Sequence, residues 1–382
     1  MNPLRDDHGS ARCVPGPADH DPTPVNPTRT RRLCIVGGST RDPGGVESFC
    51  ARALEALNTH WTGGEAFWVP ADSAHLSAAR LPRFLRALHA FRRANRVPID
   101  VLWLNVANLP DLLFVPLAKA LGIRVLVTLH LGANSRLQRS GVLRWLSRTL
   151  AARADRIALL FDGQDAEIEL PANVPRSTIR TFLPPESFAP PREAATGPEL
   201  RLIHAGRLSE GKGSLAIVDL CAALDRAGIP FTARIIGRGD EALMEALCAR
   251  IETHGLESRV ALSDWLDGPA LIAALGGADI LVHLSRLDSF PLIVLEAMAA
   301  GTIPIAIDMA GVRAMTTAYD GQLVAPDAAV SGAEAWLESN DLADLRRRGA
   351  AMGARVREDY SWAACVATLA AAIDATQPAA GA

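Results

Sequence analysis

Short, continuous apolar runs alternate with longer stretches of helical pattern from Arg31 onward. Continuous apolar runs, unlike strictly alternating ones, are typical of parallel strands that are covered on both faces. The alternation of strands and helices predicts right-handed βαβ units and therefore an α/β fold with doubly wound parallel sheets. The runs expected to form strands are 33–36, 66–69, 101–104, 125–129, 157–161, 202–205, 233–236, 260–262, 280–284 and 303–307.

A segment with five prolines, 184–199, interrupts this pattern and predicts an interdomain linker. We therefore expect two Rossmann-like domains, 31–183 and 200–360, which face a common cleft and bind ligands at the carboxyl ends of their strands. The last segment, 361–382, is expected to form a helix that packs back on the first domain, followed by a tail. The polar, Pro-rich residues 1–30 predict a disordered tail.

The composition argues against a membrane-spanning or exported protein. Apolar residues make up 49% of the chain and charged residues 21%, and no apolar run approaches the roughly 20 residues that a spanning helix requires. The polar amino terminus lacks the apolar core of a signal peptide, which predicts a cytoplasmic protein. Six cysteines lie far apart without a CxxC pair, so neither a zinc site nor a disulfide framework is expected.

Two cations follow the predicted strand 202–205 within one short loop. Gly206 permits a tight turn there, and Arg207 and Lys212 leave the strand end together. A guanidinium fork combined with an ammonium point charge suits a diphosphate. The alternative is a pair of solvated surface cations, but the position after a strand favours a phosphate site.

Gly237 and Gly239 follow the predicted strand 233–236. Two glycines at a strand exit let the backbone approach a flat ring or a phosphate. A lone Gly-x-Gly pair is weak evidence and is usually only a turn.

The most informative segment is 288–301, which follows the predicted strand 280–284. Pro291 suits the first turn of a helix, where its missing N–H is not needed. The amides near Phe290 and Leu292 then offer hydrogen-bond donors and the positive end of a helix dipole to an anion.

Two carboxylates in this segment are candidate contacts for a sugar nucleotide. Glu296 is expected to point back toward the crevice, where it can accept two hydrogen bonds from ribose hydroxyls. Asp288, in the loop before the helix, can accept bonds from sugar hydroxyls. The alternative is that Asp288 is a helix N-cap and that Glu296 complements the helix dipole.

The 288–301 segment resembles the acidic-x7-Glu signature of retaining, GT-B-fold glycosyltransferases of the "group 1" family (family four type). The Gly-Arg, Lys-Gly and Gly-x-Gly pairs stand where that family has them. The resemblance implies that Arg207 and Lys212 bind the donor pyrophosphate, Glu296 the ribose and Asp288 the transferred sugar. The family usually has Glu where this chain has Asp288, which is one methylene shorter.

Two features of the first domain also resemble this family. Gly44, Gly45 and Glu47 match its Gly-Gly-x-Glu loop, which lies over the donor phosphates; the alternative is a simple helix start with Glu47 in the first turn. His130 ends the predicted strand 125–129, where the family has a His near the donor sugar, although a lone His is usually structural. The family's Pro-Asn-Gly turn is replaced by Phe-Leu-Pro-Pro at 182–185.

The resemblance implies hexosyl transfer, with retention of anomeric configuration, from a nucleotide diphosphate sugar to a lipid-linked or polysaccharide-precursor acceptor. No cofactor and no metal are expected, because no metal-ligand set is evident. A non-catalytic nucleotide-sugar-binding subunit of a glycan assembly complex remains the main alternative, supported by the departure at Asp288. An epimerase would need further catalytic acids, and a dehydrogenase would need a full GxGxxG motif.

The first half of the chain is basic. Residues 1–190 contain 23 Lys and Arg against 17 Asp and Glu, whereas the rest of the chain is acidic. The segments 81–96 and 136–156 predict basic amphipathic helices that contact an anionic membrane peripherally, on its cytoplasmic face. The alternative for each is a core-facing helix with solvated arginines. Nucleic acid is not expected as a partner, because no binding module is recognised.

Overall fold

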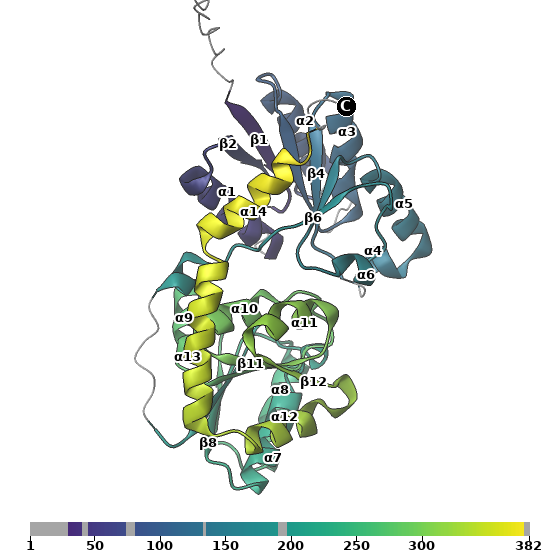
Figure 1. Cartoon of the computed structure of the whole chain (residues 1–382). Coiled ribbons are helices and arrows are strands. Elements are labelled where there is room, and N and C mark those ends of the chain that lie inside the picture. The colour runs from purple at the N-terminus through teal and green to yellow at the C-terminus, as the bar shows by residue number, and fades with distance from the viewer. Residues whose placement is uncertain (1–29, 40–44, 74–80, 133–134, 190–196, 378–382) are drawn as a thin grey trace, which may run out of the picture. The chain divides into compact units, whose positions relative to one another are not determined.

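The computed structural model describes residues 30–39, 45–73, 81–132, 135–189 and 197–377. Within these residues the first sheet has the strand order β2-β1-β3-β4-β5-β6, and every neighbouring pair is parallel (Figure 1). Its strands are β1 (Arg31–Val36), β2 (Gly64–Val69), β3 (Val101–Val106), β4 (Arg124–Leu129), β5 (Arg156–Leu159) and β6 (Arg176–Thr178).

The second sheet has the order β12-β11-β10-β7-β8-β9 and is also parallel throughout. Its strands are β7 (Leu200–Ala205), β8 (Phe231–Ile236), β9 (Val260–Ser263), β10 (Ile280–His283), β11 (Ile303–Ile307) and β12 (Gln322–Val324). The predicted α/β fold with two doubly wound parallel sheets is thereby confirmed. All ten expected strands are present, and the two that the sequence analysis missed, β6 and β12, are three-residue edge strands.

Helices connect successive strands and cover the sheets (Figure 1). Those of the first domain are α1 (Gly45–His60), α2 (Leu81–Ala94), α3 (Phe114–Ala120), α4 (Arg136–Arg139), α5 (Gly141–Ala151) and α6 (Gln164–Glu167). Those that follow β7 are α7 (Ala216–Arg226), α8 (Glu241–Thr253), α9 (Gly268–Gly276), α10 (Leu292–Ala299), α11 (Ala310–Thr316), α12 (Ala329–Glu338), α13 (Leu342–Asp359) and α14 (Trp362–Asp374).

The first sheet separates two hydrophobic cores, because successive side chains of a strand point to opposite faces. Cys34 and Val36 belong to the core that includes residues of α2 and α3. Leu33 and Ile35 belong to the core that includes residues of α1 and α14. Figure 1 shows α14, from the carboxyl-terminal end of the chain, beside α1. The final helix therefore contributes to the core of the first domain.

The second sheet has one continuous core, in which α10 and α13 pack closely. Gly301 follows α10 with a φ of +88°, and Gly349 of α13 lies against it. A Cβ at position 349 would stand 2.2 Å from the Gly301 carbonyl oxygen, so the two backbones touch only because a side chain is missing. This contact fixes the far end of α10, whose near end faces the strand exits.

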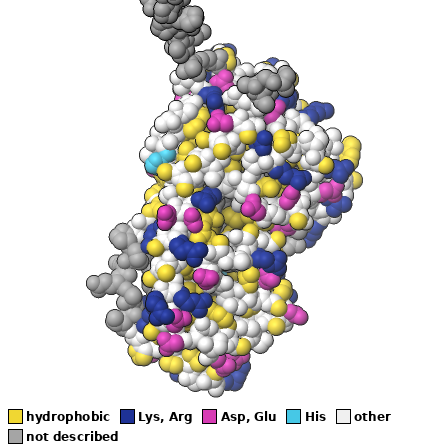
Figure 2. Space-filling view, viewed as in Figure 1, with side chains coloured by type: hydrophobic (Ala, Val, Ile, Leu, Met, Phe, Trp, Pro, Cys, Tyr) yellow, Lys and Arg dark blue, Asp and Glu magenta, His cyan; other side chains and the backbone are white. Residues whose placement is uncertain are grey.

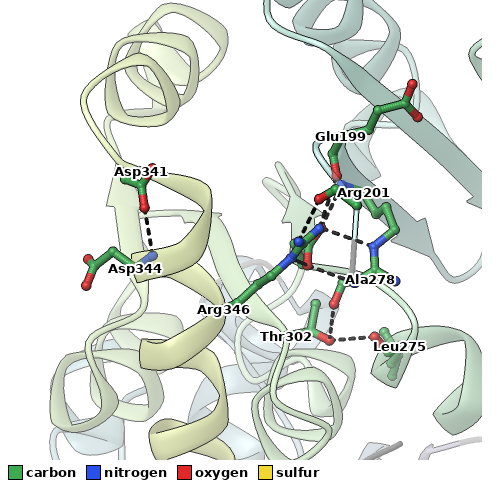
Figure 3. Close-up of polar contacts among 10 residues, drawn as sticks. Glu199, Arg201, Leu275, Ala278, Thr302, Asp341, Asp344 and Arg346 are labelled. Atoms are coloured by element: carbon green, nitrogen blue, oxygen red, sulfur yellow. Dashed lines mark hydrogen bonds and ion pairs between the residues drawn. The ribbon is translucent and has the colours of Figure 1, made fainter. Parts of the chain in front are cut away.

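A buried carboxylate lies at the amino ends of the central strands of the second sheet, opposite the strand exits. Asp279 precedes β10 and accepts hydrogen bonds from the guanidinium groups of Arg201 on β7 and Arg346 on α13, at 2.8–3.1 Å. Figure 3 shows the side chains of Arg201 and Arg346 pointing toward each other. Arg346 also donates to the carbonyl oxygens of Gly197 and Glu199. The cluster joins two strands, α13 and the end of the linker at the amino ends of the strands.

The two predicted basic amphipathic helices differ from the expectation in which side chains they bury. Phe84 and Phe91 of α2, expected on a membrane-facing side, are buried in the first-domain core, whereas Leu85 is 52% exposed. On α5, Val142 and Trp145 are exposed. The apolar side of α2 is therefore mainly a core contact, as the alternative interpretation held. The apolar side chains with the greater exposed fraction lie on α5.

Candidate active site

A cavity of about 800 Å³ lies at the carboxyl ends of the second sheet. The chain leaves β7 toward β8 on one side and returns to place β10 on the other, so the switch in strand order falls between β7 and β10. Ligands of open α/β sheets bind outside the sheet at this point. The lining includes the predicted residues Gly45, Gly206, Arg207, Lys212, Asp288, Phe290, Pro291, Leu292 and Glu296.

The loop after β7 is pressed against the loop after β10. Gly213 has a φ of +79°, and a Cβ there would stand 2.5 Å from the Leu284 carbonyl oxygen. The Arg286 amide donates to the Gly211 carbonyl oxygen at 2.9 Å. Because glycine allows this close approach, Lys212 is carried to the exit of β10.

Asp288 stands between two cationic or ionisable side chains. Lys212 Nζ forms an ion pair with Oδ1, and His283 Nε2 lies 3.3 Å from Oδ2. Burial by itself would raise the pKa of Asp288, but hydrogen bonds from His283 and Lys212 hold that pKa well below its usual range. Asp288 is therefore ionised at neutral pH. It is not a helix N-cap, since α10 begins after Pro291.

Lys212 is only partly solvated. Its side chain is 23% exposed and is engaged by Asp288. A lysine is a flexible point charge, so an anion that enters the cavity can compete with Asp288 for it.

Glu296 lies in the second turn of α10 and is buried. Its Oε1 is 3.7 Å from Nη1 of Arg52, on α1 of the first domain. Burial raises the pKa of Glu296, and the charge of Arg52 opposes that rise. Both side chains line the cavity, so an acceptor of hydrogen bonds and a cation from different domains meet at its wall.

The start of α10 faces the same cavity. Pro291 is the N-cap residue rather than a first-turn residue, one position earlier than expected. Proline has no side-chain acceptor with which to cap the first amides of a helix, and Pro291, Leu292 and Ile293 line the cavity. An anion bound there would meet the positive end of the helix dipole.

A second cavity, of about 480 Å³, adjoins the first, because Gly45, Asp288, Phe290 and Leu292 line both. His130 lines the second cavity, where Nε2 is 3.0 Å from Asn105 Oδ1 and Phe49 packs edge-on. Burial lowers the pKa of His130 to about 4. Its imidazole is therefore neutral at pH 7 and can exchange hydrogen bonds with a hydroxyl but carries no charge.

Phe290 is held by an aromatic partner from the first domain. Its ring stacks on Phe161 with a centroid separation of 5.5 Å and an interplanar angle of 5°. The adjacent Ser289 donates a hydrogen bond to Glu167 of α6. These contacts support the loop that carries Asp288.

The remaining predicted residues are Gly44, Glu47, Gly237 and Gly239. Gly44 is outside the described residues. The Glu47 carboxylate accepts a hydrogen bond from the Ser39 amide at 3.0 Å and is not among the residues that line either cavity. Gly237 and Gly239 line a separate pocket of about 290 Å³. A Cβ at position 237 would stand 1.8 Å from the Gly206 carbonyl oxygen, so this glycine allows two strand exits to pack together.

Arg52, Trp265 and His283 are among the residues that line the main cavity but were not singled out from the sequence. Arg52 stands mid-helix in another domain, and Trp265 follows the short strand β9. His283 was the one signal available, because it is a polar residue inside the expected apolar strand 280–284.

In the part of the chain that the structure describes, no cluster of three or more His, Cys, Asp or Glu side chains is arranged to hold a metal ion. Nor do those residues include a helix with the length and apolarity that crossing a bilayer demands.

Solved structures with the same architecture include a sucrose-phosphate synthase from Thermosynechococcus elongatus, with a TM-score of 0.71, 18% identity, and coverage of 89% of this chain and 98% of that one. HepE of Anabaena, solved with UDP and glucose, aligns with a TM-score of 0.66 and 15% identity, over 90% of this chain and 99% of that one. Two parallel α/β domains of this kind define the GT-B class of fold.

Residues 188–352 match the family model described as "Glycosyl transferases group 1". A phosphatidyl-myo-inositol mannosyltransferase of Mycobacterium leprae is 29% identical over 317 residues, which are 79% of each chain. A glycogen synthase of Mycobacterium tuberculosis is 31% identical over 215 residues, 56% of this chain and 49% of that protein. The chain is a glycosyltransferase that acts on a nucleotide sugar, and the match to the group 1 model covers its residues 188–352.

Proposed function

We propose that the chain transfers a hexosyl group from a nucleotide diphosphate sugar to an acceptor hydroxyl, with retention of the anomeric configuration. The convergence of Arg207, Lys212, Asp288 and Glu296 on one cavity is the observation that carries this proposal. Retention is inferred from the likeness of the 288–296 segment to the signature of retaining enzymes.

Charge builds on the departing diphosphate as the glycosidic bond breaks. Arg207 and Lys212 would stabilise that charge together with the first amides of α10, because donors fixed in a partly enclosed site need no reorganisation. Asp288 would accept hydrogen bonds from the sugar, and Glu296 from the ribose. His130, neutral at pH 7, would contact a hydroxyl from the adjoining cavity.

We further propose that no metal ion is required, because cationic side chains and helix amides supply the positive charge. Arg207 and Lys212 line the donor cavity with Arg52 from the first domain. Turnover that persists undiminished in EDTA would support this, and activity restored only by a divalent ion would contradict it.

A lipid-linked acceptor is proposed on two grounds. The mycobacterial relative is by name a phosphatidyl-myo-inositol mannosyltransferase, and Val142 and Trp145 of α5 are exposed apolar side chains on a helix that also carries arginines. Tryptophan and arginine together suit the interface of an anionic membrane. Arg144 and Arg148 both pair with Glu169, which reduces the net charge of this surface. On the face in Figure 2, basic and acidic side chains are interspersed.

The test is product formation by the full chain with radiolabelled UDP-glucose, GDP-mannose and related donors, in the presence of membranes that supply acceptors. A product that extracts into organic solvent supports the proposal, and an anomeric assignment by NMR decides retention against inversion. Donor binding by calorimetry without turnover on any membrane would favour the non-catalytic subunit. Failure of every nucleotide sugar to bind would overturn the donor site itself.

A further inference from the structure

His283 is a buried imidazole to which the proposed chemistry assigns no role. It is the last residue of β10, and its side chain is 6% exposed. Nε2 lies 3.3 Å from Asp288 Oδ2. Both atoms are buried, and neither has a hydrogen bond of full geometry with any residue in the described part of the chain, so their 3.3 Å approach is a close ionic contact. Because an unsatisfied buried polar group is unfavourable, each of these two atoms is the nearest group that can compensate the other.

The two groups that face Asp288 differ in how firmly they are held. Lys212 reaches Oδ1 from a loop, on a flexible stem, and lines the cavity beside Arg207. His283 is fixed on a strand that lies between β11 and β7. When a diphosphate with more than one negative charge enters the cavity, Lys212 can turn to it. His283 then remains as the group that holds Asp288.

A second buried histidine, on the strand next to β10, is also held in place by hydrogen bonds. His204, on the neighbouring strand β7, donates from Nδ1 to the Val282 carbonyl oxygen at 2.9 Å and accepts at Nε2 from Ser214 Oγ at 3.2 Å. Both of its ring nitrogens are therefore occupied, and burial keeps its pKa low, at about 4. Because His204 is neutral and both of its ring nitrogens are already bonded, it does not compete with His283 for the Asp288 carboxylate.

We propose that His283 is a positioning residue, which holds the Asp288 carboxylate through Nε2–H and so sets which hydroxyls of the transferred sugar Asp288 can reach. The inference rests on the proposed function and deepens it. A shorter acidic side chain than the family's usual Glu keeps the carboxylate close to the strand end, where His283 can contact it. The sugar is then recognised by an Asp–His pair, and the nucleotide by Arg207 and Glu296.

The experiment measures the full chain by calorimetry with UDP, GDP, UDP-glucose and GDP-mannose. The quantity compared is the ratio of the Kd for the nucleotide to the Kd for its sugar form. His283→Asn has an amide that replaces Nδ1 but is too short to replace Nε2, and it should lower this ratio about ten-fold, the value of one charge-assisted hydrogen bond. His283→Gln places its amide nitrogen near Nε2 and should retain the ratio. The nucleotide Kd should change in neither variant.

A double substitution separates positioning from a general structural effect. If His283 acts through Asp288, His283→Asn should cause no further loss of the ratio when it is added to Asp288→Asn. His254→Leu, at the exposed end of α8, is the matched control and should leave all four affinities unchanged. Thermal unfolding of each variant identifies any loss of folded protein.

Equal losses of nucleotide and nucleotide-sugar affinity in His283→Asn would overturn the inference, as would a full additional loss in the double variant. The same holds if His283→Gln behaves as His283→Asn. If the wild-type chain binds none of the four compounds, the proposed function is wrong and this inference falls with it.

Discussion

Lys212 and Asp288, which are 76 positions apart in the sequence, form an ion pair inside the cavity between the exits of β7 and β10. One is the expected contact of the donor diphosphate and the other of the transferred sugar. In this ion pair each charge neutralises the other. Under the proposed function, donor binding would exchange this pair for contacts with the substrate, and recognition of the diphosphate by Lys212 would then be linked to the availability of the Asp288 carboxylate for the sugar.

Lys212→Ala should lower turnover about 100-fold or more, because loss of one fixed donor to developing charge costs that much in other enzymes. Folding stability should fall by only about 1 kcal/mol, since His283 still contacts Asp288 and the pair is partly solvated. Initial rates of product formation and thermal unfolding measure the two effects. Lys119→Ala is the control. It removes a lysine of α3 that pairs with Asp155, and it should retain turnover. Wild-type turnover in Lys212→Ala would contradict the site.

Arg52→Ala should raise the KM for the donor about ten-fold. It leaves the buried Glu296 carboxylate without its cation, so the pKa of Glu296, already raised by burial, rises further. The defect should therefore grow as the pH is lowered, because a protonated Glu296 accepts fewer hydrogen bonds from ribose. Donor KM between pH 8 and pH 6 measures it. Arg250→Ala, which breaks a pair with Asp219 on α7, should leave KM unchanged at every pH.

Asp279→Asn should affect stability and not activity, unlike the substitutions in the cavity. We expect a loss of about 3 kcal/mol in the free energy of unfolding and unchanged turnover of the folded enzyme. Burial favours protonation of Asp279, but hydrogen bonds from Arg201 and Arg346 hold its pKa below the ordinary value. A lowered folded-state pKa contributes stability above the unfolded value of about 4, and this contribution is lost as the pH falls below it. Urea unfolding should thus show a larger difference from wild type at pH 7 than at pH 3. A lowered kcat with intact stability would contradict this account.

The lowered pKa of the buried His204 predicts that the protein loses stability on mild acidification. Burial lowers its pKa to about 4, whereas an unfolded His has a pKa of about 6.5. Between these values the unfolded chain binds more protons than the folded one, so stability falls as the pH drops from 6.5 to 4, by about 3 kcal/mol for this group. His204→Asn, whose amide can still donate to the Val282 carbonyl oxygen, should unfold with a shallower pH dependence across this range. If the free energy of unfolding changes with pH in the same way in wild type and in His204→Asn, the pH dependence does not come from His204.

Trp145→Glu should reduce binding to anionic phospholipid vesicles about ten-fold or more, because it replaces an exposed apolar ring on α5 with a charge that the surface repels. Vesicles of pure phosphatidylcholine should bind weakly in either case. Leu121→Glu, an exposed position after α3, provides the comparison. Co-sedimentation with vesicles of 30% phosphatidylserine is the assay. Equal sedimentation of the two variants and wild type would place any membrane contact elsewhere.

Local pattern was sufficient for most of the fold. A buried parallel strand must be apolar on both faces, so ten strands are visible as continuous runs. The strands β6 and β12 were not predicted, because each has only three residues and lies at a sheet edge. One side of an edge strand meets solvent, so a continuous apolar run is not required there. Residues 288–296 were likewise identifiable, because a proline, a helix start and two acidic side chains occur within one short segment.

Only the tertiary structure determined which side chains meet. The pairing of Lys212 with Asp288, of Arg52 with Glu296, and of His283 with Asp288 each depends on segments that are distant in sequence or on the exit angle of a strand. The close backbone contact of Gly237 with Gly206 likewise joins two strand exits that are distant in sequence. Hydrophobic periodicity is a property of one segment and can be read along it. Charge pairing and close backbone approach are properties of two segments, and the chain has to fold before they exist.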